Sequence, residues 1–189
     1  MFEEDLMDAL ELVINRRSQP RLQAPAPAGE ALENIKRAAL RAPDHAALAP
    51  WRFIICEGKG LNKLGAIFEQ SAIDNDKSER EILRAPQLPL RAPMVIVITT
   101  AYQEHEKVPA PEQYASASCA AMAMQMAAVP QGFQGMWRTG DYAHCPIVKA
   151  GLDIDPKDDI VGFLYLGTPA QDVVDKPALD PAGFFRTLS

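Results

Sequence analysis

A long stretch without any charged side chain constrains this chain more than any other feature of its sequence. It runs from Gln113 to Trp137, and the part from Gln113 to Val129 is rich in alanine and methionine, which are strong helix formers. A helix that is apolar on all sides is buried on all sides. Because glutamines and serines interrupt the stretch, we interpret it as a core helix and not as a membrane span. We expect this helix to bend or end near Pro130.

Three apolar runs predict the strands of a sheet: Trp51–Glu57, Met94–Thr100 and Ile160–Leu166. The second run is unbroken, which is typical of a strand covered on both faces. Apolar residues at helical spacing predict further helices over 6–14, over 32–39 and, in two pieces broken around Asp74, over 61–85. The sequence therefore predicts an α+β fold in which helices wrap a small central mixed sheet. Three strands make a narrow sheet, so a second chain could support it.

Length and charge narrow the classes of function. The chain has 189 residues, which favours a single domain over 1–189. The net charge of -6 disfavours nucleic acid and anionic membranes as partners. The three cysteines and three histidines show neither a disulfide framework nor the spacing of a zinc site, so we expect no metal. The acidic start lacks a hydrophobic signal core, which predicts a cytoplasmic protein. Residues 1–6 precede a second methionine, Met7, and we interpret them as an N-terminal extension.

The C-terminal tail, residues 170–189, contains prolines and the pair Phe184 and Phe185. An extended segment with two phenylalanines gains free energy by burying them. We therefore expect the tail to clasp either the body of its own chain or a partner subunit.

Arg16, Arg17 and Ser18 follow the first predicted helix. Two guanidinium groups and a hydroxyl can bind a phosphate through charge and paired donors. Alternatively, arginines at the end of a helix complement its dipole.

A second cluster, Arg41 to His45, lies in a loop that leads into the first predicted strand. Loops at such junctions commonly hold ligands, and His45 could donate a hydrogen bond to a ring carbonyl or a phosphate. Alternatively, Asp44 and His45 form a local turn pair.

A third cluster spans Gly132 to Gly140. Its glycines let the backbone approach a ligand, Trp137 offers a planar surface, and Arg138 and Thr139 add hydrogen-bond donors. Alternatively, the segment is a glycine-rich turn with a core tryptophan. The patterns GxGxxG, GxxxxGK[ST], GxSxG and HExxH are all absent. The sequence therefore gives no support to a Rossmann dinucleotide fold, a P-loop protein, a serine hydrolase or a zinc protease.

These clusters occur in one order with the buried 120–128 helix segment and with the run Val161 to Pro169. Together they resemble the nitroreductase family, and most closely its short, YdjA-type bacterial branch, from Met7 to the C terminus. The resemblance implies a nitroreductase-like α+β fold, an intertwined homodimer and one FMN at each of two interface sites.

The resemblance also implies the residues of the site. Cofactor-binding residues are Arg16, Arg17 and Ser18 from one subunit, Arg41 and His45 from the other, and Trp137, Arg138 and Thr139, which complete the pocket. Residues near the nicotinamide nucleotide are Ala127, Ala128, Val129, Pro130, Gln131 and Gly132. No side chain is expected to act as a nucleophile, because the flavin carries the chemistry.

The implied function is hydride transfer from NAD(P)H through the flavin N5 atom to a nitroaromatic, quinone or similar small acceptor, by a ping-pong mechanism. The alternative is an FMN-binding storage or sensor protein without turnover. Three positions depart from the family pattern: Pro20, where a basic residue is common, Ala49, where glutamine is usual, and Pro130, where a small residue is expected. Pro20 and Pro130 are the features that favour the alternative.

Overall fold

The structure, a computed structural model, describes residues 9–172 and 177–188. The predicted extension over 1–6, and the start of the first predicted helix, lie outside the described residues. The helices are α1 (Ala9–Asn15), α2 (Gly29–Ala39), α3 (Lys59–Asp74), α4 (Glu79–Arg84), α5 (Ala110–Ala128), α6 (Asp141–His144) and α7 (Pro146–Gly151). The strands are β1 (Leu22–Gln23), β2 (Trp51–Glu57), β3 (Met94–Thr100), β4 (Gln134–Arg138) and β5 (Ile160–Pro169). Short 3-10 helices, η1 to η5, occupy His45–Ala47, Ala85–Gln87, Pro89–Arg91, Val129–Gln131 and Pro181–Gly183.

The strands form a sheet in the order β1-β5-β3-β2, and β4 also pairs with β5. The three predicted strands are confirmed, whereas β1 and β4 were not predicted. Every described strand pair is antiparallel, so the expectation of a mixed sheet is wrong for the single chain. The β4 segment begins Gln-Gly and follows a helix end closely, a pattern that favours a loop or a turn over a strand.

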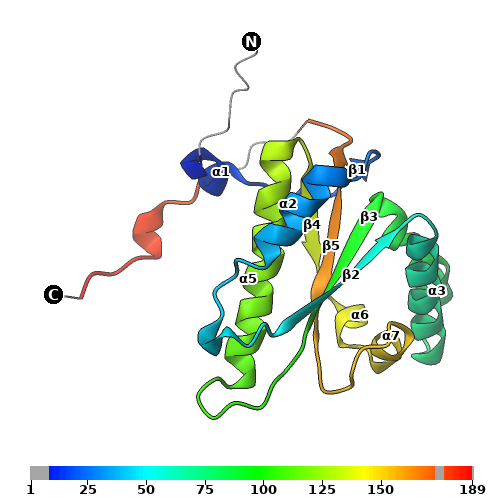
Figure 1. Ribbon diagram of the computed structural model, residues 1–189. Coiled ribbons are helices and arrows are strands. Elements are labelled where there is room, and N and C mark those ends of the chain that lie inside the picture. The colour runs from blue at the N-terminus through cyan, green and yellow to red at the C-terminus, as the bar shows by residue number, and fades with distance from the viewer. Residues whose placement is uncertain (1–8, 173–176, 189) are drawn as a thin grey trace.

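Helices cover both faces of the sheet, as Figure 1 shows. Strand β3 is buried along its whole length, as its apolar run predicts. Its side chains alternate between two hydrophobic clusters, because successive residues of a strand point to opposite faces. Met94, Ile96 and Ile98 contribute to the cluster with α2 and α5, whereas Val95 and Val97 contribute to the cluster with α3 and α7.

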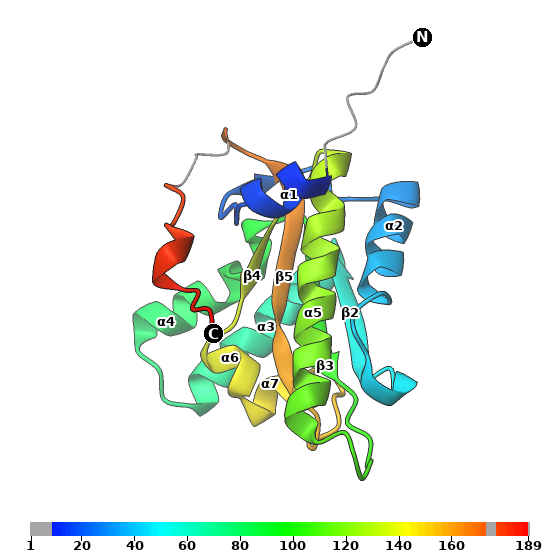
Figure 2. The same cartoon turned by 90° about the vertical axis from the view of Figure 1, so that its left-hand side faces the viewer.

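Helix α5 ends just before Pro130, as expected, and Gly132 follows it with a left-handed φ of 82°. The expectation that α5 is buried on all sides is wrong for the single chain. Ala120, Ala121 and Met124 are buried, but Cys119 is exposed and Met122 is 40% exposed. The sheet and α2 cover α5 on two sides only, and Figure 2 looks onto the open side.

Helix α1 and residues 177–188 project from the body on the side of α5 (Figure 1). The apolar face of α1 remains in solvent, because Leu10, Val13 and Ile14 are each more than 60% exposed. Phe184 and Phe185 of the tail are 70% and 81% exposed. The chain's own body therefore does not bury the apolar side chains of these two segments.

Among the described residues, no helix is both long enough and apolar enough to cross a bilayer. The three cysteines are free thiols. No group of potential metal ligands gathers in this part of the chain.

We expect Gly162→Ala to destabilise the protein. The Trp137 Nε1 atom donates to the carbonyl oxygen of Val161 at 3.3 Å, and a Cβ atom at Gly162 would lie 2.2 Å from that nitrogen. The free energy of unfolding in urea should fall by about 1–3 kcal/mol. Gly60→Ala in α3 is the control, because its Cβ would meet Cys56 at an ordinary 3.8 Å. Equal stabilities for the two variants would contradict this packing.

Candidate functional site

The segment that carries Arg16, Arg17 and Ser18 is fastened to the start of β4. The carbonyl oxygen of Gly135 accepts the Gln19 backbone N–H at 3.0 Å and the Gln125 side-chain amide at 2.8 Å. A Cβ at position 135 would lie 3.1–3.2 Å from its neighbours, so glycine permits this close approach. The residues after α1 are thereby held against both β4 and α5.

Arg16 presents an unpaired donor at this place. Its Nη1 atom is buried and has no hydrogen-bond partner, although an unpaired buried donor costs free energy. Arg17 and Ser18 beside it are partly buried. An oxyanion such as a phosphate would satisfy the orphaned donor and offset its charge, so the residues present fit the phosphate of a nucleotide.

The side chains of β4 alternate between the two faces of the sheet. Trp137 packs with the α5 cluster, so it is partly a core residue, as the alternative interpretation held. Arg138 points to the other side and lies over the ring of Tyr165, 5.6 Å from its centroid. The Nε atom of Arg138 is buried without a hydrogen-bond partner. Thr139 follows β4 and is exposed.

A cavity of about 890 Å³ opens beside Arg138, between the end of β4 and helices α3, α4 and α6. Its walls include Trp137 and Thr139, but also Arg84 and Arg91, which the sequence analysis did not single out. Arg84 is the last residue of α4 and Arg91 is the last residue of η3. Both are far along the sequence from the three clusters that the sequence analysis singled out. The packing of α4, η2 and η3 against α3 brings them to the cavity.

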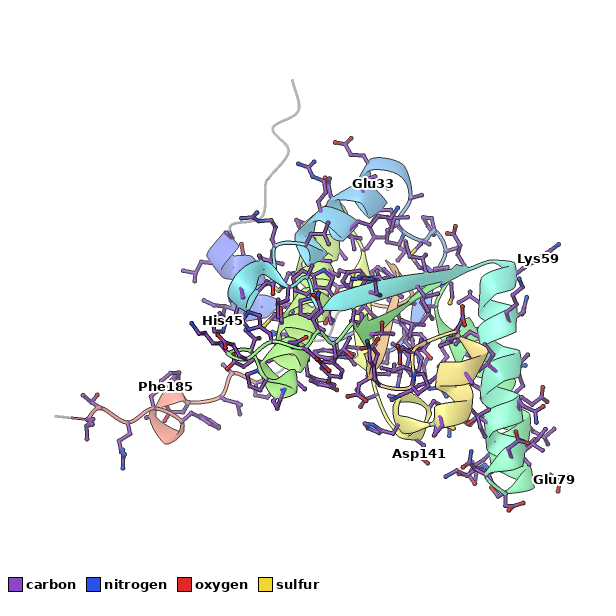
Figure 3. All side chains as sticks on the ribbon, turned by 60° about the horizontal axis from the view of Figure 1, so that its bottom comes forward. Glu33, His45, Lys59, Glu79, Asp141 and Phe185 are labelled. Atoms are coloured by element: carbon purple, nitrogen blue, oxygen red, sulfur yellow. The ribbon has the colours of Figure 1, made fainter. Side chains whose placement is uncertain are left out.

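The second cluster lies at the N-terminal end of α5. The Ser116 hydroxyl donates to the carbonyl oxygen of Pro43 at 2.5 Å, and the Nδ1 atom of His45 lies 3.0 Å from a carboxylate oxygen of Glu112. Asp44 accepts the backbone N–H groups of Leu48 and Ala49. Asp44 thus has a local structural role, whereas His45 contacts Glu112 and does not form the expected turn pair with Asp44. His45, labelled in Figure 3, thus contacts α5 through Glu112.

Arg41 is exposed at the end of α2, close to the His45 loop in the chain. Ala46, Ala47 and Ala49 all adopt left-handed backbone conformations, which L-residues other than glycine and asparagine rarely adopt. The hydrogen bonds of Asp44 hold this unusual loop in place. The loop therefore has a defined conformation, although Ala49 stands where glutamine is usual in the family.

A single chain does not bring the two clusters together. Glu112, which contacts His45, and Gln125, which contacts Gly135, lie on the same helix. The rise of 1.5 Å per residue separates them by ~20 Å. Arg41 and His45 thus lie at one end of α5, and the segment Arg16–Ser18 lies at the other.

The predicted nicotinamide segment occupies the C-terminal end of α5 and η4. The Gln131 side chain contacts Asn34 and the carbonyl oxygen of Ala127, so it ties η4 to α2 and to α5. Pro130 and Gly132 are exposed. This segment leads directly into β4, so it lies on the same side of the molecule as Arg16.

The chain is similar to known proteins in sequence and in fold. The model of the nitroreductase family matches residues 13–168. "Putative NAD(P)H nitroreductase YdjA" of Escherichia coli K12 is 52% identical over 163 residues, 86% of this chain and 89% of that protein. A similarly named protein of Haemophilus influenzae is 39% identical over the same shares.

Solved structures share the fold of this chain. A nitroreductase-like family protein from Bacillus cereus matches with a TM-score of 0.83, 20% identity and 96% coverage of both chains. A nitroreductase with bound FMN from Bacteroides fragilis matches with a TM-score of 0.74, 21% identity and full coverage of both chains. The resemblance that the ordered motifs indicated and the nitroreductase-like α+β fold are both confirmed.

We expect Gln125→Met to loosen the segment that carries Arg16. Gln125 is 3% exposed, and methionine keeps its length but removes the donor to Gly135. Losing this buried hydrogen bond should cost about 1–3 kcal/mol, measured by chemical denaturation. The Gln19 amide should also exchange its hydrogen faster, because its acceptor is less firmly placed. Unchanged exchange at Gln19 would show that α5 does not position this segment.

Proposed function

Because the chain belongs to the nitroreductase family, we propose that it is an FMN-dependent oxidoreductase. It would transfer hydride from NAD(P)H to a small acceptor such as a nitroaromatic or a quinone, by a ping-pong mechanism. The relatives named as NAD(P)H nitroreductases and the FMN-bound structure of the same fold support the cofactor and the donor. The observation that carries the proposal is the buried, unpaired Nη1 atom of Arg16 beside β4.

FMN, when bound, would supply the redox chemistry, and the chain would bind and orient it. Arg16, Arg17 and Ser18 would hold the phosphate, because they combine charge with hydrogen-bond donors. Trp137 and Thr139 would complete the pocket from β4, and the orphaned Nε atom of Arg138 offers a further donor to an anion. No side chain is needed as a nucleophile.

The nicotinamide donor would contact the segment from Ala127 to Gly132. Exposed Pro130 and Gly132 support this placement, since they leave the end of α5 accessible. The side chain of Gln131 already bonds to α2 and α5, so the backbone of η4 is the part available to the donor.

The chain would function as a homodimer. The two clusters lie ~20 Å apart along α5, so one FMN reaches both only if Arg41 and His45 come from a partner subunit. A twofold axis beside α5 places the end of one copy against the opposite end of the other. The exposed apolar side chains of α1, and Met122 on α5, supply an apolar surface for this contact.

The tail would clasp the partner subunit, because Phe184 and Phe185 are exposed on their own chain. Figure 3 shows Phe185 well away from the body. The chain would act as a single domain. Three free cysteines fit the reducing conditions of the cytoplasm.

The purified protein should show a flavin absorbance spectrum that bleaches on anaerobic addition of NADPH or NADH. The reason is that a flavin held with an open face accepts hydride directly from the donor. A flavin that stays oxidised would favour the storage or sensor function. A protein that takes up no flavin even after incubation with FMN would overturn the proposed function.

Met122→Lys should separate the dimer and release FMN, because each site needs both subunits. Burying an unpaired charge costs about 3 kcal/mol or more, a factor of ~100 or more in the dissociation constant of the dimer. Sedimentation velocity measures the oligomeric state. Leu83→Lys is the matched control, because Leu83 on α4 is 68% exposed and lies away from the α5 face. A wild-type monomer that retains FMN would refute the shared site.

A further inference from the structure

The large cavity beside β4 has a positive charge that its own acidic residues do not balance. Four lysine or arginine side chains and two acidic ones line it: Lys77, Arg84, Arg91, Arg138, Glu81 and Asp141. Lys77 pairs with Asp141 at 2.7 Å. Glu81 accepts the backbone N–H and the hydroxyl of Ser78 at the start of α4. In the part of the chain that the structure describes, the three arginines therefore have no ion pair.

The three arginines act on one another within this cavity. Burial lowers the pKa of Arg91, and the neighbouring charges of Arg138 and Arg84 lower it further. Arg138 is partly buried, and its Nε atom has no hydrogen-bond partner. Positive charges that face one another without a counter-ion raise the free energy of the protein. The protein as a whole carries a net charge of -6. The three arginines therefore form a local positive cluster on a protein whose net charge is negative.

We infer that Arg84, Arg91 and Arg138 bind a phosphate monoester, in a second oxyanion site apart from Arg16. A phosphate monoester is a dianion near neutral pH, and its oxygens match the forked donors of guanidinium groups. The inference rests on the proposed function. Because Arg16, Arg17 and Ser18 would hold the 5'-phosphate of FMN, the phosphate monoester left for the second site is the 2'-phosphate of NADPH.

Arg91 would make the protein prefer NADPH over NADH, because NADH lacks the 2'-phosphate. The Tyr165 ring below Arg138 fixes one side of the site and leaves the guanidinium edge free for oxygen.

Two binding titrations with full-length Arg91→Gln test the site. The flavin-free protein is titrated with FMN and with riboflavin, which lacks the phosphate. The FMN-loaded protein is titrated with adenosine 2',5'-bisphosphate and with adenosine 5'-monophosphate. We expect adenosine 2',5'-bisphosphate to lose affinity about tenfold or more, whereas the affinities for adenosine 5'-monophosphate, FMN and riboflavin are unchanged. A loss of affinity confined to FMN would overturn the inference. Arg91→Lys, which keeps the charge but loses the fork, should lose less.

Arg80→Gln is the matched control, because it removes the same charge from α4 at a residue that does not line the cavity. If Arg91→Gln binds all four probes as Arg80→Gln does, the second site is refuted. If Arg91→Gln does not fold, Arg84→Gln decides by the same comparison, since Arg84 is exposed. Wild-type protein that binds neither flavin would overturn the proposed function. If the wild-type protein binds FMN and the variants bind every probe with wild-type affinity, only the second site is overturned.

Discussion

One carbonyl oxygen joins three elements of the fold at the Arg16 end of the candidate site. The Gly135 oxygen accepts both the Gln19 backbone N–H and the buried amide of Gln125, so β4, the segment after α1 and helix α5 meet at one atom. The hydrogen bond from Gln125 to Gly135 explains how a glutamine can be buried on a mostly apolar helix. A buried polar group is stable only when it is hydrogen-bonded. The position of Arg16 depends on this contact.

The second organising constraint is that α5 has more apolar surface than one chain covers. The sheet and α2 bury two sides, and the remaining side lies open below α1 (Figure 2). The same helix separates the Arg16 and His45 clusters. The proposed dimer would therefore complete the core and the site together, because a second copy of the chain would pack along α5.

Much of the fold could be predicted from the sequence, because its signals are local. The unbroken run of β3, the break between α3 and α4 and the end of α5 before Pro130 follow from apolar patterns and from backbone chemistry. Strand β4 was missed because its glycine and its short length suggested a turn. The exposed side of α5 was missed because an apolar sequence does not reveal whether the covering partner is the same chain.

The candidate site was predictable only in part. The ordered motifs indicated Arg16 and His45, and the family resemblance assigned them to different subunits. Sequence reasoning did not find Glu112 beside His45, or Arg84 and Arg91 beside Arg138, because tertiary packing alone brings these residues together. The separation along α5 has a genetic consequence if the proposed dimer forms. A mixed dimer of one chain damaged only at Arg16 and another damaged only at His45 would concentrate both defects in one site and leave the other whole, so two inactive alleles could complement each other.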